Sequence, residues 1–211
     1  MSASVSVDEI AIADPAEAWT RAGFTVSDQV SRVGDVSVRL VGRDRGTGIL
    51  GWSLRGVSSE GALDGIPTTP SDNAAGDPDT HANGVTSIDH IVLLSPDLAR
   101  TVAALAAIGV QPRRERDGEL GGRTIRQIFF RFGSVIIEVV GSPTVTGEGP
   151  SSLWGITYTV ADIDASAAYL GERTTPIKSA VQPGRRITTL DHRALGMSVR
   201  TALISPHTLD A

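Results

Sequence analysis

Two stretches decide the fold: residues 88–98, IDHIVLLSPDL, and residues 135–141, VIIEVVG. The first is typical of a strand that leads into a helix, because an apolar run is followed by the helix-starting residues Ser, Pro and Asp. The second is typical of a half-buried strand. Each stretch carries one side chain suited to metal binding or proton transfer, His90 in the first and Glu138 in the second. Strand alternation predicts that each projects from a largely apolar face.

The first stretch is repeated within the chain. Residues 7–15, VDEIAIADP, align with 88–96, IDHIVLLSP, at a constant offset of 81 residues. Residues 154–162, WGITYTVAD, form a third copy, in which Asp162 stands where Asp97 stands. Each copy leads into a short Ala-rich segment that a glycine ends, as expected for a helix. The sequence therefore predicts three copies of one supersecondary unit.

Three β-like segments follow each predicted helix. They are 24–27, 36–41 and 49–57 in the first unit, 110–115, 123–132 and 135–141 in the second, and 177–181, 185–190 and 197–205 in the third. This order predicts an α+β protein built from βαβββ modules. The modules are expected at 1–57, 86–141 and 152–206. The last two are joined by a short connection, so we expect them to form one domain.

Residues 58–85 separate the first unit from the second. They are rich in Gly, Pro, Asp, Ser and Thr, and Leu63 and Ile66 are their only large apolar residues apart from the terminal Val85. A segment of this composition is predicted to be a flexible linker.

Composition excludes several kinds of function. The net charge of −5 and pI of about 5.3 make nucleic acid an unexpected partner. The absence of cysteine excludes thiolate metal sites and disulfides. The first fifteen residues lack the pattern of a signal peptide, and no apolar run has the length of a membrane helix. We therefore expect a soluble cytoplasmic protein with no membrane partner.

With these features the chain resembles the vicinal oxygen chelate superfamily, the glyoxalase-like proteins. The resemblance rests on 88–98, on Arg126-Gln127 within TIRQIFFRFG, and on 135–141, and it covers residues 86–206 best. It implies paired βαβββ modules whose curved mixed sheets surround a cleft. It also implies a divalent metal, held by residues from the first and last strand of each module, that chelates two neighbouring oxygens of a substrate.

The resemblance implies that His90 and Glu138 are metal ligands, and that Glu138 also transfers a proton. A neutral imidazole and a carboxylate suit Zn, Ni, Mn or Fe. In the first unit Glu9 occupies the histidine position, and we expect it to be a third ligand if units one and two pair. Ser53 occupies the position of Glu138.

The third unit departs from the pattern, because Gly155 occupies the histidine position and Thr201 the position of Glu138. Neither is an ordinary metal ligand, and we expect Thr201 to contact substrate instead. Gln127 and Arg185 are the other expected substrate contacts. An arginine on this strand suits an anionic group such as a carboxylate or enolate.

Other polar and aromatic residues are expected to be structural. Asp8 and Asp89 precede the key positions and should project to the opposite face. The three tryptophans are expected to fill the core, and no function is expected for the remaining histidines. These residues are Trp19, Trp52, Trp154, His81, His192 and His207.

Besides a purely structural or regulatory role with a filled cleft, two functions remain open at this stage. The first is a metal-dependent lyase, isomerase or dioxygenase acting on a small oxo or enolate substrate. The second is a metal-free protein that binds or sequesters a small molecule in the same cleft. Because an unpaired first unit would expose a sheet edge, a homodimer is one expected arrangement.

Overall fold

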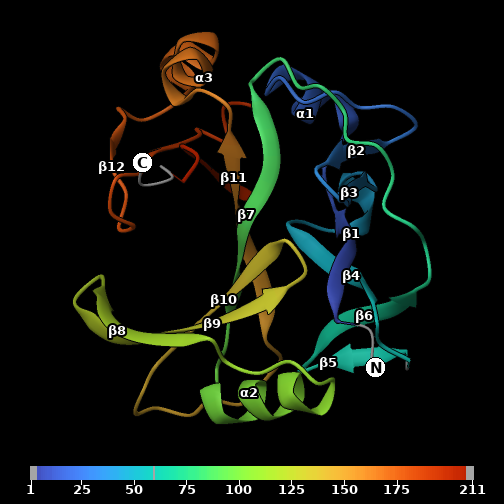
Figure 1. Ribbon diagram of the computed structural model, residues 1–211, viewed down its shortest axis with the longest axis vertical. Helices are drawn as coiled ribbons and strands as arrows, with labels where there is room; N and C mark the ends of the chain where they lie inside the picture. The colour runs from blue at the N-terminus through green and yellow to red at the C-terminus, as the bar shows by residue number, and fades with distance from the viewer. Residues whose placement is uncertain (1–3, 59, 208–211) are drawn as a thin grey trace.

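The computed structural model describes residues 4–58 and 60–207, which form two curved sheets standing side by side (Figure 1). The N-terminal half contains β1 (Ser6–Ile12), α1 (Ala16–Arg21), β2 (Val30–Val33), β3 (Val36–Leu40), the short helix η1 (Arg43–Arg45), β4 (Ile49–Arg55), β5 (Gly61–Leu63) and β6 (Ile66–Ser71). The C-terminal half contains β7 (Val85–Leu94), α2 (Leu98–Ala107), β8 (Arg114–Leu120), β9 (Arg123–Phe132), β10 (Val135–Gly141), β11 (Ser152–Val160), α3 (Ile163–Leu170), the short helix η2 (Gly171–Arg173), β12 (Lys178–Ser179), β13 (Arg186–Thr189) and β14 (Arg200–Ile204).

Units two and three share the C-terminal sheet, whose strand order is β12-β13-β14-β11-β7-β10-β9-β8. The first strands of the two units, β7 and β11, lie antiparallel at its centre. Each first strand pairs in parallel with the last strand of its own unit, β7 with β10 and β11 with β14. The predicted class, curved mixed sheets built from repeated βαβββ modules, is confirmed.

The N-terminal sheet repeats the inner six strands of the C-terminal sheet. Its order is β2-β3-β1-β4-β6-β5, and every neighbouring pair has the same sense as in β9-β10-β7-β11-β14-β13. Strand β4, predicted as the last strand of unit one, therefore takes the place of β11, the first strand of a second unit. The N-terminal half is thus itself a pair of modules, and the second of them lacks a helix.

This topology changes two expectations. The linker predicted at 58–85 contains β5 and β6, and β6 alternates buried Ile66 and Thr68 with exposed Pro67 and Thr69. The short alternating pattern of β6 was missed because residues 58–85 as a whole have the composition of a linker. Unit one also finds its partner strands within the chain, so the reason for expecting a dimer is removed. Residues 1–3 and 59 of the predicted ranges lie outside the described residues.

The segment between β6 and β7 runs along the outer side of the N-terminal sheet (Figure 1). Asp79 pairs with the edge strand β2, accepting from the Arg32 N–H at 2.8 Å and donating its own N–H to the Arg32 carbonyl at 3.0 Å. His81 is 5% exposed, its Nδ1 accepts from the Thr25 N–H at 3.1 Å, and its Nε2 lies 3.1 Å from the Arg32 carbonyl. The segment therefore covers a sheet edge that would otherwise be open.

His81 is expected to make stability pH-dependent. Burial lowers the pKa of His81 below its ordinary value of 6.5, and protonation would remove the acceptor for Thr25. The folded state therefore keeps His81 neutral, and its contribution is lost as pH falls below 6.5. We expect His81→Ala to lower the free energy of unfolding by about 2 kcal/mol at neutral pH. Urea unfolding at about pH 7.5 and about pH 5.5 should show a smaller pH effect in the variant than in the wild type.

One apolar core joins the two halves. Trp52 stacks on Phe132 with ring centroids 5.6 Å apart, and Trp19 packs edge-on against Tyr158 at 6.4 Å. Trp19 and Trp52 are buried as predicted, whereas Trp154 is 43% exposed. The prediction was wrong for Trp154, because a register shift in β11 between Leu153 and Gly155 turns it out of the core.

Aspartate side chains set the starts of the two C-terminal α-helices. Helix α2 begins at Leu98 because its N-cap is Asp97, whose Oδ1 accepts from the Arg100 N–H at 3.1 Å. Asp162 caps α3 in the same way, accepting from the N–H groups of Asp164 and Ala165. No helix in the described part of the chain is long and apolar enough to cross a membrane.

Candidate functional site

His90 and Glu138 lie on neighbouring strands of one face of the C-terminal sheet. The Nε2 of His90 is 3.5 Å from Oε2 of Glu138, and the two side chains are 15% and 12% exposed. Strand pairing places Val92 beside Glu138 and Thr157 beside His90 on the same face. Val92 and Thr157 both line a pocket of about 610 Å³. His90 and Glu138 therefore lie beside residues that line the pocket, although neither is itself among its lining residues.

Asp89 joins this site because of a β-bulge. The register of β7 against β11 skips Asp89, so both Asp89 and His90 turn towards the same side. Oδ2 of Asp89 accepts a hydrogen bond from Nδ1 of His90 at 2.8 Å. The expectation that Asp89 projects to the opposite face was wrong, because strict alternation fails at a bulge.

Arg185 forms an ion pair with Asp89 and so balances its charge. Its Nη1 lies 2.6 Å from Oδ1 of Asp89, and its side chain is only 1% exposed. Its Nε donates to the Ser205 carbonyl at 2.8 Å. Burial alone would raise the pKa of Asp89, but His90 and Arg185 together hold it below its ordinary value. Arg185, predicted as a substrate contact, is buried and forms an ion pair with Asp89.

Gln127 links Glu138 to the outer strands of the sheet. Its Nε2 donates to Oε1 of Glu138, and its Oε1 accepts from Nε of Arg116 at 2.9 Å. Gln127, predicted as a substrate contact, therefore hydrogen-bonds to Glu138. Arg116 was missed, because only the pairing of β8 with β9 brings it opposite Gln127.

Thr201 is among the residues that line the pocket of about 610 Å³, but it forms no hydrogen bond with His90 or Glu138. It pairs with Ile156, so its side chain shares the core-facing side, where it is 2% exposed and donates to the Val199 carbonyl at 3.0 Å. The register assigns Ala202, not Thr201, to the position of Glu138, because Ala202 pairs with Thr157 as Glu138 pairs with Val92.

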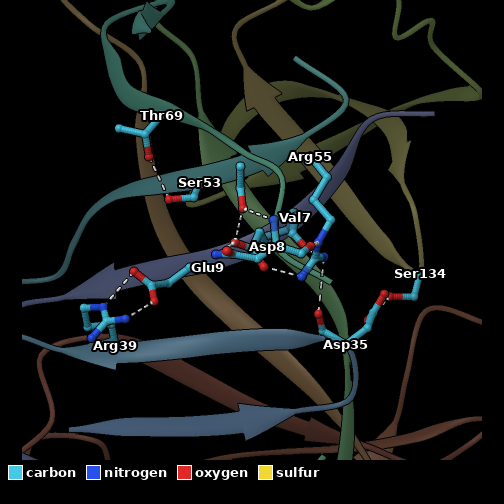
Figure 2. Close-up of polar contacts among 11 residues, drawn as sticks. Val7, Asp8, Glu9, Asp35, Arg39, Ser53, Arg55, Thr69 and Ser134 are labelled. Atoms are coloured by element: carbon cyan, nitrogen blue, oxygen red, sulfur yellow. Dashed lines mark hydrogen bonds and ion pairs between the residues drawn. The ribbon is translucent and has the colours of Figure 1, made fainter. Parts of the chain in front are cut away.

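Glu9 lies in the N-terminal sheet and forms an ion pair with Arg39. Oε2 of Glu9 is 2.7 Å from Nη2 of Arg39, and Oε1 accepts from its Nε at 2.8 Å (Figure 2). The register makes Arg39 the counterpart of Glu138, because Arg39 pairs with Ala11 as Glu138 pairs with Val92. The N-terminal copy of the site therefore holds an ion pair where the C-terminal copy holds His90 and Glu138. Ser53, predicted at this position, instead bonds Thr69 at 2.7 Å.

The bulge is also duplicated. The register of β1 against β4 skips Asp8, as that of β7 skips Asp89. Asp8 forms an ion pair with Arg55, and its Oδ2 accepts from Ser71 Oγ at 2.5 Å and from Asn73 Nδ2 at 3.2 Å (Figure 2). The Asp that precedes both Glu9 and His90 in the sequence was the signal that could have identified these bulges.

The donor chemistry of the site accommodates a cation or a proton. When His90 is neutral, its Nδ1 proton is directed at Asp89, so a lone pair on Nε2 faces the Glu138 carboxylate. Two ligands about 2.1 Å from a tetrahedral metal lie about 3.4 Å apart, close to the separation of these atoms. A hydroxyl or acidic proton of a ligand would fit the same space. Within residues 4–58 and 60–207, no group of three His, Asp or Glu side chains is arranged to hold a metal.

Comparisons with known proteins identify the fold. No protein-family model and no curated protein matches the chain. Among solved structures, a mutant of 4-hydroxymandelate synthase from Streptomyces coelicolor superposes with a TM-score of 0.65 at 15% identity, over 100% of this chain and 94% of that one. The chain has the vicinal oxygen chelate fold.

Two further vicinal oxygen chelate structures agree. Catechol 2,3-dioxygenase gives a TM-score of 0.62 at 10% identity, over 97% of this chain and 89% of that chain. A variant of homoprotocatechuate 2,3-dioxygenase from B. fuscum gives 0.60 at 12% identity, over 99% and 73%. These superpositions cover both halves of the chain, which agrees with the internal duplication of the sheets. At these identities they establish the fold alone.

Proposed function

We propose that this vicinal oxygen chelate protein binds a small organic molecule in the C-terminal cleft, with His90 and Glu138 as its polar contacts. The observation that carries the proposal is the asymmetry of the cleft. Unit two contributes an imidazole and a carboxylate, while the corresponding positions of unit three are Gly155 and Ala202. A ligand, rather than a full set of protein donors, would occupy the space facing the pair.

The pocket beside the pair supports this proposal. Its volume of about 610 Å³ lies within the usual range for small-molecule sites. Its wall combines apolar surface with hydroxyl groups, supplied by Thr157, Thr174, Thr175 and Thr189. Hydroxyl groups both donate and accept, which suits oxo and enolate oxygens.

A second candidate is a divalent-metal-dependent lyase, isomerase or dioxygenase, as the family resemblance implies. The 3.5 Å separation of the His90 and Glu138 donor atoms favours it. Asp89 supports it too, because metal-binding histidines commonly donate their other ring N–H to a carboxylate. His90 and Glu138 would hold the metal, and water or substrate oxygens would supply the remaining ligands. Bound there, a metal would act as a Lewis acid on a substrate oxygen.

Thermal-shift measurements on Glu138→Ala test the site and separate the candidates. We expect small oxo acids, such as oxalate and phenylpyruvate, to raise the Tm of the wild type. The apparent affinity behind this shift should fall at least tenfold in the variant, since a buried ligand contact is lost. Glu9→Ala is the matched control, because Glu9 occupies the duplicated position and its loss should leave the shift unchanged.

Parallel scans with Zn, Ni, Mn and Fe(II) decide between the candidates. Stabilisation by organic acids without metal supports the binding protein. Stabilisation that needs a metal, and that disappears in Glu138→Ala, supports the metal-dependent enzyme. Equal responses of the wild type and Glu138→Ala to every ligand and metal would reject a site at Glu138.

A further inference from the structure

A second cavity lies at the junction of the two halves. Its volume is about 460 Å³, and twelve residues from both halves line it. They come from η1, the start of β4, the start of β11 and the segment that leads into β14. The cavity shares Trp154, His192, Arg193 and Arg200 with the cleft pocket, so the two spaces adjoin at these residues.

The lining of this junction cavity is strongly basic. It contains Arg43, Arg193 and Arg200, and none of its twelve residues is Asp or Glu. This is unusual in a chain whose net charge is −5. Burial and the nearby charges of Arg200 and Arg193 lower the pKa of His192, and they outweigh the opposing charge of Asp191. The electrostatic environment is therefore favourable for an anion.

The three arginines differ in how they are held. Arg43 is tied by its Nη2 to the Gly196 carbonyl at 2.5 Å and to Asp14 at 3.3 Å. Arg193 and Arg200 form no ion pair with any carboxylate of the described residues. The Arg200 guanidinium lies 4.8 Å from the ring centroid of Trp154, which holds it over the cavity. Two guanidinium groups thus remain free to bind a ligand.

Ser198 adds a neutral donor. Its Oγ accepts a hydrogen bond from the Gly48 N–H at 2.8 Å, which fixes the oxygen between the halves. A hydroxyl that accepts one hydrogen bond can still donate its proton to a second group. Guanidinium and hydroxyl donors around one cavity are typical of phosphate recognition.

We propose that the junction cavity binds a phosphate group, with Arg193, Arg200 and Ser198 as its donors. Because the cavity adjoins the cleft pocket at Trp154, the phosphate can belong to an organic ligand whose remaining part extends towards the cleft. The proposal goes beyond ligand binding at His90 and Glu138 and does not depend on it, since none of the three donors belongs to that pair.

Tryptophan fluorescence gives a direct test. Trp19 and Trp52 are 0% and 3% exposed and Trp154 is 43% exposed, so iodide should quench Trp154 selectively. We expect inorganic phosphate to protect Trp154 from iodide, while chloride at equal ionic strength does not. Phenyl phosphate should protect at lower concentration than inorganic phosphate if the ligand is an organic phosphate, and at the same concentration if free phosphate is the ligand.

The matched variants carry equal charge changes. In Arg193→Gln/Arg200→Gln the phosphate concentration that raises the Tm should increase at least tenfold. In Arg113→Gln/Arg123→Gln, two exposed arginines outside the cavity, it should stay unchanged. Glu138→Ala should keep phosphate binding even if it loses oxo-acid binding, so the two proposals fail separately. No protection of Trp154 by phosphate, or equal losses in the two double variants, would overturn the phosphate site.

Discussion

Replacing Asp64 by Ala is expected to lower the free energy of unfolding by about 3 kcal/mol. Its side chain is 4% exposed and lies in the turn between β5 and β6. It accepts from Ser151 Oγ at 2.5 Å and from Thr101 Oγ1, and it forms an ion pair with Arg100 at 2.5 Å. One carboxylate thus fastens the N-terminal sheet to unit two.

The pH dependence of Asp64 follows from the same contacts. Burial alone would raise the pKa of Asp64, but hydrogen bonds from Ser151, Thr101 and Arg100 outweigh it and lower the pKa. The stabilisation is therefore present above the ordinary value of 3.8 and is lost as pH falls below it.

Denaturant unfolding of Asp64→Ala measures the loss in the free energy of unfolding. Asp64→Asn is the second variant. Asp64 has a φ of +51°, which Asn tolerates better than Ala, so this variant removes the charge with less backbone strain. Asp117→Ala, which removes an exposed ion pair with Arg126, should change the Tm little. An Asp64→Ala protein as stable as Asp117→Ala would show that Asp64 does not hold the halves together.

Replacing Arg185 by Met is expected to cost about 3 kcal/mol, because it leaves the Asp89 carboxylate without its buried partner. The variant should also weaken ligand binding at His90, since Asp89 orients the imidazole. Arg186→Met is the matched control, because the neighbouring arginine forms an exposed ion pair with Asp164 and its loss should hardly change the Tm.

A double variant separates charge from packing. Arg185→Met/Asp89→Asn removes both charges, so part of the stability lost in Arg185→Met should return. Ligand affinity should not return, because an amide in place of the Asp89 carboxylate no longer holds His90 as a charged acceptor does. Equal stability of the single and double variants would mean that the ion pair does not account for the loss.

The sequence predicted the features that depend on local pattern. Repeated strand-to-helix motifs were sufficient for the module class and for placing His90 and Glu138 on one face of a sheet, because strand alternation and helix starts are local properties. The same reasoning failed for Asp89 and Trp154, because a bulge shifts the alternation of side chains by one residue.

Contacts between distant segments could not be predicted from the sequence either. Glu9 was expected beside His90, yet the parallel pairing of β1 with β3 places it against Arg39. The residues of β5 and β6 were interpreted as a linker, because their short strands gain stability from β4 and from Asp64 contacts rather than from their own composition. The positions of Glu9, β5 and β6 were determined by strand register and by packing between the two halves, rather than by local secondary-structure propensity.

The most direct test of a ligand site at His90 and Glu138 is a crystal structure of the protein soaked with the oxo acid that raises its Tm most. The predicted result is electron density for the acid in the C-terminal cleft, within hydrogen-bond distance of His90 Nε2 or Glu138, and none beside Glu9 and Arg39. Density for the acid at the N-terminal ion pair, or anywhere on the protein except the C-terminal cleft, would contradict it.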